Sequence, residues 1–242
     1  MAVAPSSEAR PSALGLALGG AAVAALAVVT PWALEALLGR LGPRGLALLL
    51  LAVTAVSLPL RRARAGGGWA AAAGMAALLA AGAASGDARF LRLVPAWIYV
   101  VLAALFAASL RRQGSLLESA ARWLVPEAPG FIRGYCRVLT AVWVAIFLAS
   151  ATIAGWLALV GSPDAWLRFT SRHVWLAMGA FSALEFLVRK TWFRNYFHGG
   201  PFERCWSRLF PAERTARGRR SLQYIAEYRA ELARKTAAER GG

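Results

Sequence analysis

Three residues on one predicted helix have types and spacing that could bind an anionic lipid group. Arg137, Thr140 and Trp143 follow one another at steps of three, which puts a guanidinium, a hydroxyl and an indole near one helical face. The guanidinium of Arg137 could bind a lipid phosphate or the carboxylate of an acyl chain, because planar N–H forks match both groups. A simpler interpretation, which we favour, is an interfacial anchor in which Thr140 bonds to its own backbone.

Glu185 is a carboxylate inside a long apolar stretch, close to the end of that stretch. A charge at such a position is costly unless it is paired, so Glu185 needs a cationic partner. Arg189 stands four residues later, at the spacing of an ion pair along one helical face. Arg137 is a second candidate partner. We expect a structural ion pair, and the alternative is that Glu185 handles a proton or a substrate.

No recognised catalytic motif occurs in the sequence. His198 and Glu203 loosely resemble the His-x4-Asp pair of glycerolipid acyltransferases, but Glu replaces Asp and the residues between them are typical of a turn. A nucleophile elbow, a phosphate-binding loop and a dinucleotide fingerprint are all absent. The two cysteines, Cys136 and Cys205, lack metal-ligand spacing. We therefore expect no catalytic residue, metal or cofactor, which favours a non-enzymatic role and leaves an enzymatic one open.

Six long apolar stretches must position these residues. They cover residues 13–30, 45–60, 67–85, 94–110, 138–161 and 173–188, and 58% of the chain is hydrophobic. A helix needs about 20 apolar residues to cross a bilayer. The sequence therefore predicts an all-α, polytopic membrane bundle of six transmembrane helices at 13–190, a disordered tail at 1–12 and a basic, amphipathic segment at 191–242. A four-span form, in which the second and third stretches make a re-entrant pair, is the alternative.

Arginines are unevenly divided among the gaps between these stretches. The second and fourth gaps hold eight (Arg61, Arg62, Arg64, Arg111, Arg112, Arg122, Arg133 and Arg137), whereas the first, third and fifth together hold six (Arg40, Arg44, Arg89, Arg92, Arg168 and Arg172). The segment 189–242 adds 13 basic and 5 acidic residues to a net charge of +16. Positive residues in short loops mark the cytoplasmic side. We therefore expect both termini in the cytoplasm of a bacterial inner membrane.

Two regions on the predicted cytoplasmic side are amphipathic. Within the 111–134 loop, leucines and alanines recur at helical spacing over 115–125, opposite Glu118 and Arg122, which predicts a short helix lying on the inner leaflet. In the tail, aromatic residues alternate with arginines over 192–210, and 221–240 has the pattern of a polar helix with one apolar face. We expect these basic surfaces to contact anionic membrane lipids and not nucleic acid.

Four segments of the second half match, in order, the landmarks of a known family. They are 106–110 (Phe-Ala-Ala-Ser-Leu), 117–122 (Leu-Glu-Ser-Ala-Ala-Arg), the set Tyr135, Arg137, Thr140 and Trp143, and 184–189 (Leu-Glu-Phe-Leu-Val-Arg). Over roughly residues 90–190 the chain resembles an uncharacterised family of bacterial inner-membrane proteins encoded beside genes for aryl-polyene (xanthomonadin-like) pigments. It departs from that family in the fifth stretch, where Ser150 and Thr152 stand in place of an Asn.

The resemblance implies a pathway but no established reaction. It predicts a non-catalytic membrane component that scaffolds or handles an acylated intermediate at the inner leaflet. The candidate lipid-binding residues are Arg137, Thr140, Trp143, Glu185 and Arg189. Acidic acyl-carrier proteins or pathway enzymes would then bind the basic cytoplasmic face. The alternatives are a transporter or flippase for the lipid product, and a membrane-embedded acyl- or glycosyltransferase that uses His198 and Glu203. The sequence does not specify an oligomeric state.

Overall fold

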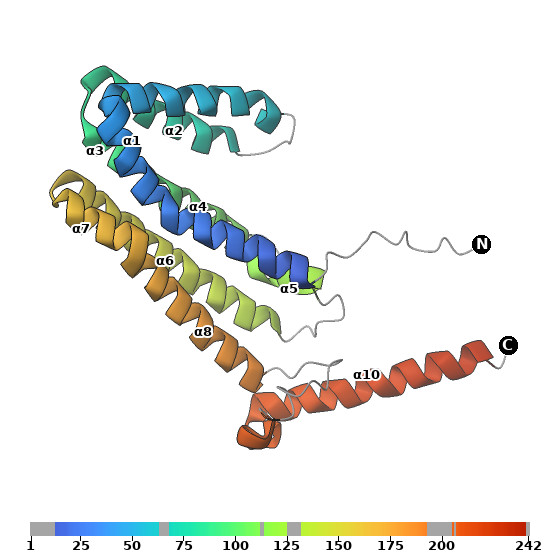
Figure 1. The fold of residues 1–242 in the computed structure, drawn as a ribbon. Helices are drawn as coiled ribbons and strands as arrows, with labels where there is room; N and C mark the ends of the chain where they lie inside the picture. Colours follow the sequence, from blue (N-terminus) through green and yellow to red (C-terminus); the bar gives the residue numbers. More distant parts are fainter. Residues whose placement is uncertain are drawn as a thin grey trace. The chain divides into compact units, whose positions relative to one another are not determined.

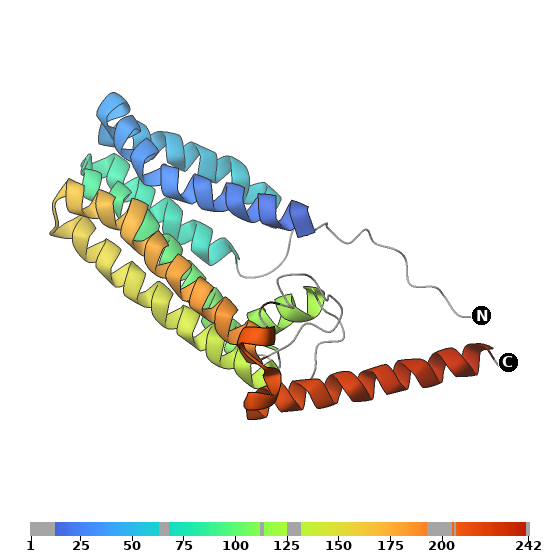
Figure 2. The same cartoon turned by 60° about the horizontal axis from the view of Figure 1, so that its bottom comes forward.

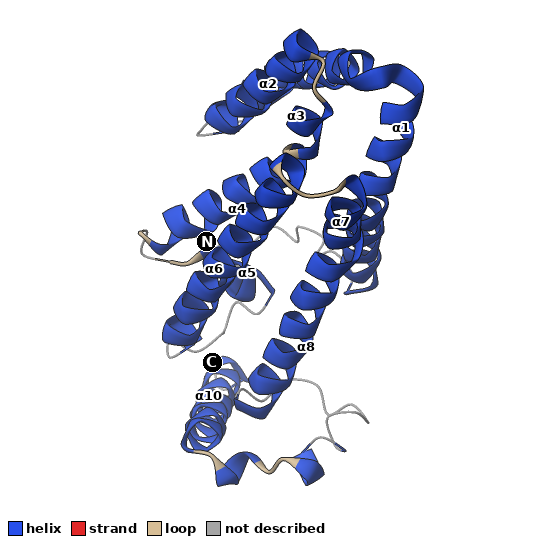
Figure 3. Cartoon of the chain, turned by 90° about the vertical axis from the view of Figure 1, so that its left-hand side faces the viewer, coloured by secondary structure: helices blue, strands red, loops and turns tan. Residues whose placement is uncertain are grey.

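Every regular element in the described part of the chain is a helix. The computed structural model describes residues 13–62, 68–111, 114–124, 132–192, 205 and 207–240, and no strand occurs among them (Figure 1, Figure 3). The helices are α1 (Ala13–Arg62), α2 (Gly68–Ser85), α3 (Ala88–Arg92), α4 (Val94–Leu110), α5 (Leu116–Leu124), α6 (Ile132–Leu159), α7 (Pro163–Arg168), the π-helical η1 (Phe169–His173), α8 (Val174–Trp192), the 3₁₀ turn η2 (Ala212–Arg214) and α10 (Ala216–Arg240). The predicted all-α class is confirmed for these residues, whereas the predicted tail at 1–12 lies outside them.

Three helical segments of the described chain are long and apolar enough to cross a membrane. They are Thr30–Ala55, Ala88–Leu110 and Ile132–Leu159, and Trp69–Ser85 is a shorter apolar helix. The predicted stretches 67–85, 94–110 and 138–161 correspond to α2, α4 and α6, and the stretch 173–188 begins at the end of η1 and continues in α8. The structure thus has the helices of a membrane protein, and the count of six spans stays a prediction.

α1 is broken once, at Gly42. Its two arms, 13–41 and 43–62, contain the first two predicted stretches, so the gap expected between them is helical up to this glycine. Gly42 has φ 68° and ψ 169°, in a left-handed backbone region that glycine adopts without strain. Pro43 follows and has no backbone N–H to donate to the preceding turn. The ribbon turns sharply here (Figure 1), so the membrane-length segment Thr30–Ala55 is not one straight rod.

Small residues in α2 allow close contacts between helices. At Gly74 an added Cβ would lie 2.1 Å from the indole of Trp97 in α4, and at Gly82 it would lie 3.2 Å from Cβ of Phe90 in α3. The Trp97 indole Nε1 donates a hydrogen bond to the carbonyl of Ala71 at 3.1 Å, which fixes the ring over the space that Gly74 leaves. Glycine and alanine therefore have a packing role here, because they let backbones and flat rings approach closely.

α4 and α6 pack against each other through small residues and one aromatic contact. The buried alanines are Ala96 and Ala103 on α4, and Ala151, Ala154 and Ala158 on α6. Phe106 and Phe147 meet edge to face with ring centroids 5.2 Å apart. The outer faces instead carry large apolar side chains: Leu105, Val138 and Trp156 are 55%, 66% and 64% exposed. Small residues inside and large ones outside are typical of helices that pack in lipid, where burial of large side chains gains little.

α5 confirms the predicted short helix, and one of its charged residues is buried. Glu118 is buried, whereas Leu116 on the same helix is 40% exposed. α5 (light green in Figure 2) lies beside the first turns of α6. Glu118 therefore faces the protein, whereas Leu116 and Arg122 face outward.

The second compact unit begins inside α8. The chain separates into Met1–Leu176 and Ala177–Gly242, and the second unit contains the end of α8 together with α10. α10 starts earlier than the predicted polar helix at 221–240, because the hydroxyl of Thr215 accepts the N–H of Gly218 at 3.0 Å and caps its first turn. Tyr224 and Tyr228 stack on one face of α10 with centroids 6.4 Å apart. Most of the predicted interfacial stretch 192–210 lies outside the described residues.

Replacing Gly74 by alanine should destabilise the packing of α2 on α4. The new methyl group would lie 2.1 Å from a ring carbon of Trp97, so the indole would have to move and its bond to Ala71 would weaken. Overpacking of this kind costs roughly 1–3 kcal/mol, which should lower the thermal unfolding midpoint in detergent by a few degrees. Gly39→Ala is the matched control: nothing lies within 4 Å of its Cβ position, so it should leave the midpoint unchanged or raise it. Equal losses for the two variants would contradict a tight α2–α4 contact.

Candidate functional site

A buried carboxylate joins α5 to α6. The side chain of Glu118 is only 7% exposed; its Oε1 accepts a hydrogen bond from Nε of Arg122 at 3.1 Å, and its Oε2 lies 3.5 Å from Nε of Arg133. The two arginine side chains are 43% and 55% exposed. One buried anion thus holds two half-exposed cations together. We name Glu118, Arg122 and Arg133 the Glu118 cluster.

Two serines fix the first turn of α5 and so position Glu118. The hydroxyl of Ser109, at the end of α4, accepts the N–H of Leu116 at 3.1 Å, and the hydroxyl of Ser115 accepts the N–H of Glu118 at 3.3 Å. Ser115 and Glu118 have the Ser-x-x-Glu spacing of a capping box, although the Glu118 side chain turns toward the arginines instead of back to the cap. This spacing is the signal in the sequence that could have identified Glu118 as a positioned residue.

The structure separates Arg137 from Thr140. Arg137 is exposed on α6, whereas Thr140 is fully buried and donates its hydroxyl hydrogen bond to the carbonyl of Cys136 at 2.7 Å. Trp143 is half-buried, with its ring centroid 5.4 Å from that of Phe147. The backbone bond of Thr140 agrees with the simpler interpretation of this set. Arg137 alone among the three presents its charge at the surface, and its binding role stays a prediction.

Glu185 and Arg189 form the expected ion pair within α8. Nε of Arg189 lies 3.1 Å from Oε1 of Glu185, whose side chain is 15% exposed. The guanidinium also lies over the ring of Phe186, 5.6 Å from its centroid, which adds a cation–π contact. Both partners come from one helical face at i,i+4 spacing. The pair satisfies the carboxylate locally.

The remaining candidate residues form no cluster among the residues that the structure describes. His198 and Glu203 lie outside the described residues, and His173 is exposed at the end of η1. Within the described ranges, no group of three His, Cys, Asp or Glu side chains could hold a metal ion. Cys136 is buried in α6 and Cys205 is exposed.

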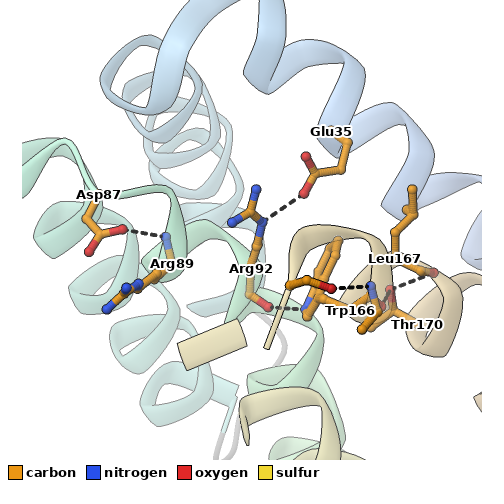
Figure 4. A network of polar contacts seen from close by, with 9 residues as sticks. Glu35, Asp87, Arg89, Arg92, Trp166, Leu167 and Thr170 are labelled. Carbon is orange, nitrogen blue, oxygen red and sulfur yellow. Dashed lines mark hydrogen bonds and ion pairs between the residues drawn. The ribbon is translucent and has the colours of Figure 1, made fainter. Parts of the chain in front are cut away.

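A second polar network connects α1, α3 and α7 (Figure 4). Nε of Arg92 donates to Oε1 of Glu35 at 2.9 Å, and these side chains are 17% and 25% exposed. The backbone carbonyl of Arg92 accepts the indole N–H of Trp166 at 3.0 Å. The Trp166 ring is fully buried, and the carbonyl of Trp166 accepts the hydroxyl of Thr170 at 2.9 Å. Arg92 thus ties two sequence-distant helices together through its side chain and its backbone.

This network brings three predicted gaps to the same end of the first unit. Glu35 belongs to the first gap, Arg92 to the third and Trp166 to the fifth. The first and third gaps meet again where an added Cβ at Gly86 would lie 3.0 Å from Nε of Arg44. The Glu118 cluster, from the fourth gap, instead lies where α5 meets the beginning of α6. Glu35, Arg92 and Trp166, one from each odd-numbered gap, therefore lie at one end of the first unit.

Removing either partner of the Glu35–Arg92 pair should destabilise the first unit. We expect each of Glu35→Ala and Arg92→Ala to lose about 1–3 kcal/mol, because the remaining charge is largely buried without its counterion. The double variant should lose less than the sum, with a coupling energy of roughly 1–2 kcal/mol. Thermal unfolding in detergent measures the four free energies. Arg89→Ala, at an exposed position nearby, should have little effect, and strictly additive losses would show that the pair does not connect α1 to α3.

Comparison with known proteins returns no relative. No family model, no curated protein and no solved structure matches this chain. Its function is therefore inferred from its own residues and contacts, and the family resemblance of residues 90–190 stays an expectation.

Proposed function

We propose that this chain crosses a bacterial inner membrane six times, with both termini in the cytoplasm. The meeting of Glu35, Arg92 and Trp166 supports an alternating path, because each crossing reverses the side on which the chain emerges. α8 provides the sixth crossing: its 19 residues span about 28 Å at 1.5 Å per residue. The arginines of the second and fourth gaps and of the basic tail favour the cytoplasm for the other end.

Cysteine labelling of intact spheroplasts tests this topology. In a Cys205→Ser background, buried Cys136 provides the unlabelled baseline. Arg89→Cys and Asp164→Cys, at exposed positions in odd-numbered gaps, should react with a membrane-impermeant maleimide. Arg111→Cys, exposed at the end of α4, should react only after lysis. Labelling of positions 89 and 111 from the same side would contradict a crossing by α4.

At the cytoplasmic end, the protein scaffolds or handles an acylated intermediate of the aryl-polyene type and does not catalyse its reaction. One observation carries this proposal: exposed apolar side chains of α6 continue toward exposed arginines at its first turns. Val138 and Val142 are 66% and 37% exposed, and Arg133 and Arg137 precede them on α6 as exposed cations. A helix end that exposes both apolar side chains and cations suits an amphiphile with an acyl chain and an anionic head.

The partners that this role implies are acidic. Acyl-carrier proteins are acidic, so a basic cytoplasmic surface would attract them and speed their association. α10 begins with such a surface, since Arg217, Arg219 and Arg220 fall within its first turns. The resemblance of residues 90–190 indicates the pathway, and the basic surface would attract the acidic carrier proteins of that pathway.

Lipid profiling of a deletion strain by mass spectrometry tests the role. Loss of a scaffold should reduce the finished polyene and raise an acylated precursor, and the wild-type gene should reverse both changes. Finished product in normal amount but retained in the inner membrane would indicate export instead. An unchanged profile would contradict any part in this pathway.

A Glu185→Gln gene in the same strain separates the scaffold from a proton-coupled transporter. The scaffold needs no titrating group in α8, so this variant should restore the product to near the wild-type amount. The Glu185–Arg189 pair supports that expectation, because it gives the carboxylate a structural partner. Full loss of product in this variant, with normal protein levels in the membrane, would favour transport.

A further inference from the structure

We propose that the Glu118 cluster binds the phosphate group of an anionic lipid. The inference rests on the proposed function for the position of α5 at the inner leaflet, and it identifies a site that lies apart from Thr140, Trp143 and Glu185. Four features carry it: the unused donors of two arginines, the buried anion that holds them, the excess positive charge and the exposed apolar side chains on the same two helices.

Both arginines contact Glu118 through Nε alone. The Nε atoms of Arg122 and Arg133 lie 3.1 Å and 3.5 Å from the two carboxylate oxygens. Among the described residues, neither guanidinium has a further partner, so the N–H groups of their Nη atoms stay available to a ligand. The side chains are 43% and 55% exposed, so a ligand can reach those groups. Planar guanidinium forks match the oxygen geometry of a phosphate group.

Glu118 holds the two cations near each other before a ligand arrives, through a hydrogen bond from Arg122 and a longer ion pair with Arg133. Its side chain is 7% exposed and each of its oxygens faces one arginine, one from α5 and one from α6. Two guanidiniums without this anion would repel each other, and a ligand would have to order both. A site whose charged groups are already held loses less entropy when it binds.

The net charge of the cluster favours the binding of one anion. Two arginines and one glutamate sum to +1, which matches the single negative charge of a phosphodiester. Arg137 lies one turn after Arg133 on the same side of α6 and is exposed, so it adds a third cation next to Arg122 and Arg133. The site is therefore attractive to a phosphate group although its central residue is an acid.

Exposed apolar side chains on α5 and α6, the two helices that carry the cluster, favour a lipid over free phosphate. Leu116 on α5 is 40% exposed, and Val138 and Val142 on α6 are 66% and 37% exposed. The two valines stand four residues apart and so form a strip along α6, and Val138 directly follows Arg137 in that helix. An acyl chain could lie on this strip while its phosphate binds the arginines. Inorganic phosphate would gain nothing from that surface.

Exchange of arginine for lysine separates a phosphate site from general charge attraction. Arg122→Lys combined with Arg133→Lys keeps both charges and the contact with Glu118 but removes the planar forks. The purified full-length chain in detergent is titrated with a soluble short-chain phosphatidylglycerol, and bound lipid is measured by native mass spectrometry. We expect the apparent Kd of the double variant to be about tenfold weaker than that of the wild type.

The matched control changes two exposed arginines outside the cluster. Arg111→Lys combined with Arg208→Lys makes the same chemical exchange at two exposed positions that are not part of the cluster, and its Kd should equal that of the wild type. Circular dichroism and elution volume check that both double variants keep their helices and their size. Equal losses in the two double variants, or no loss in either, would overturn the site.

Two further probes identify the source of the phosphate. A short-chain diacylglycerol, which lacks the phosphate, should bind weakly and equally to the wild type and the cluster variant. Millimolar inorganic phosphate should compete poorly with phosphatidylglycerol, because it makes no contact with Val138 or Val142. Complete displacement by inorganic phosphate would indicate a free-phosphate site and overturn the lipid assignment.

The titration tests the phosphate site and the lipid profile tests the pathway role, so either proposal can be contradicted without the other. A normal profile in the deletion strain, together with a selective loss of phosphatidylglycerol binding in the cluster variant, would remove the pathway role and leave the phosphate site. An altered profile with unchanged binding would remove the phosphate site and leave the pathway role.

Discussion

Carboxylates that are largely shielded from solvent need cationic partners within the protein, because burial removes the water that would otherwise stabilise their charge. Glu35, Glu118 and Glu185 illustrate this constraint: each has an arginine nitrogen within 2.9–3.1 Å. The first two also connect separate elements, since Arg92 reaches α1 from α3 and Arg133 reaches α5 from α6. The ion pairs therefore decide which helix ends meet, in addition to neutralising their own charges.

Threonine hydroxyls on α1 and α6 donate hydrogen bonds to backbone carbonyls of their own helices. Thr54, Thr140 and Thr152 each donate to the carbonyl four residues earlier, at 2.7–2.9 Å. Close packing then depends on small residues and flat rings, as where Gly74 admits the indole of Trp97. Close packing of this kind explains why the buried faces of α4 and α6 hold alanine while their outer faces hold leucine, valine and tryptophan.

One kind of ion pair has different consequences at the two ends of the first unit. Arg92 and Glu35 are 17% and 25% exposed, and the Arg92 carbonyl also accepts the indole of Trp166, so this pair is part of the packed core. Arg122 and Arg133 are 43% and 55% exposed around a buried Glu118, so their outer nitrogens stay accessible. Burial of the cations makes the first pair structural, and exposure of the cations makes the second a candidate binding site.

The sequence alone determined the features that follow from spacing along a single helix. The apolar stretches located α2, α4 and α6, and the i,i+4 spacing of Glu185 and Arg189 predicted their ion pair, because a helical repeat places such residues on one face. Only the tertiary structure decided which face of each helix meets a neighbour. It turned Glu118 inward and divided exposed Arg137 from buried Thr140. It also joined Glu35 to Arg92 across 57 residues, a contact that arises from the packing of whole helices and leaves no mark in local spacing.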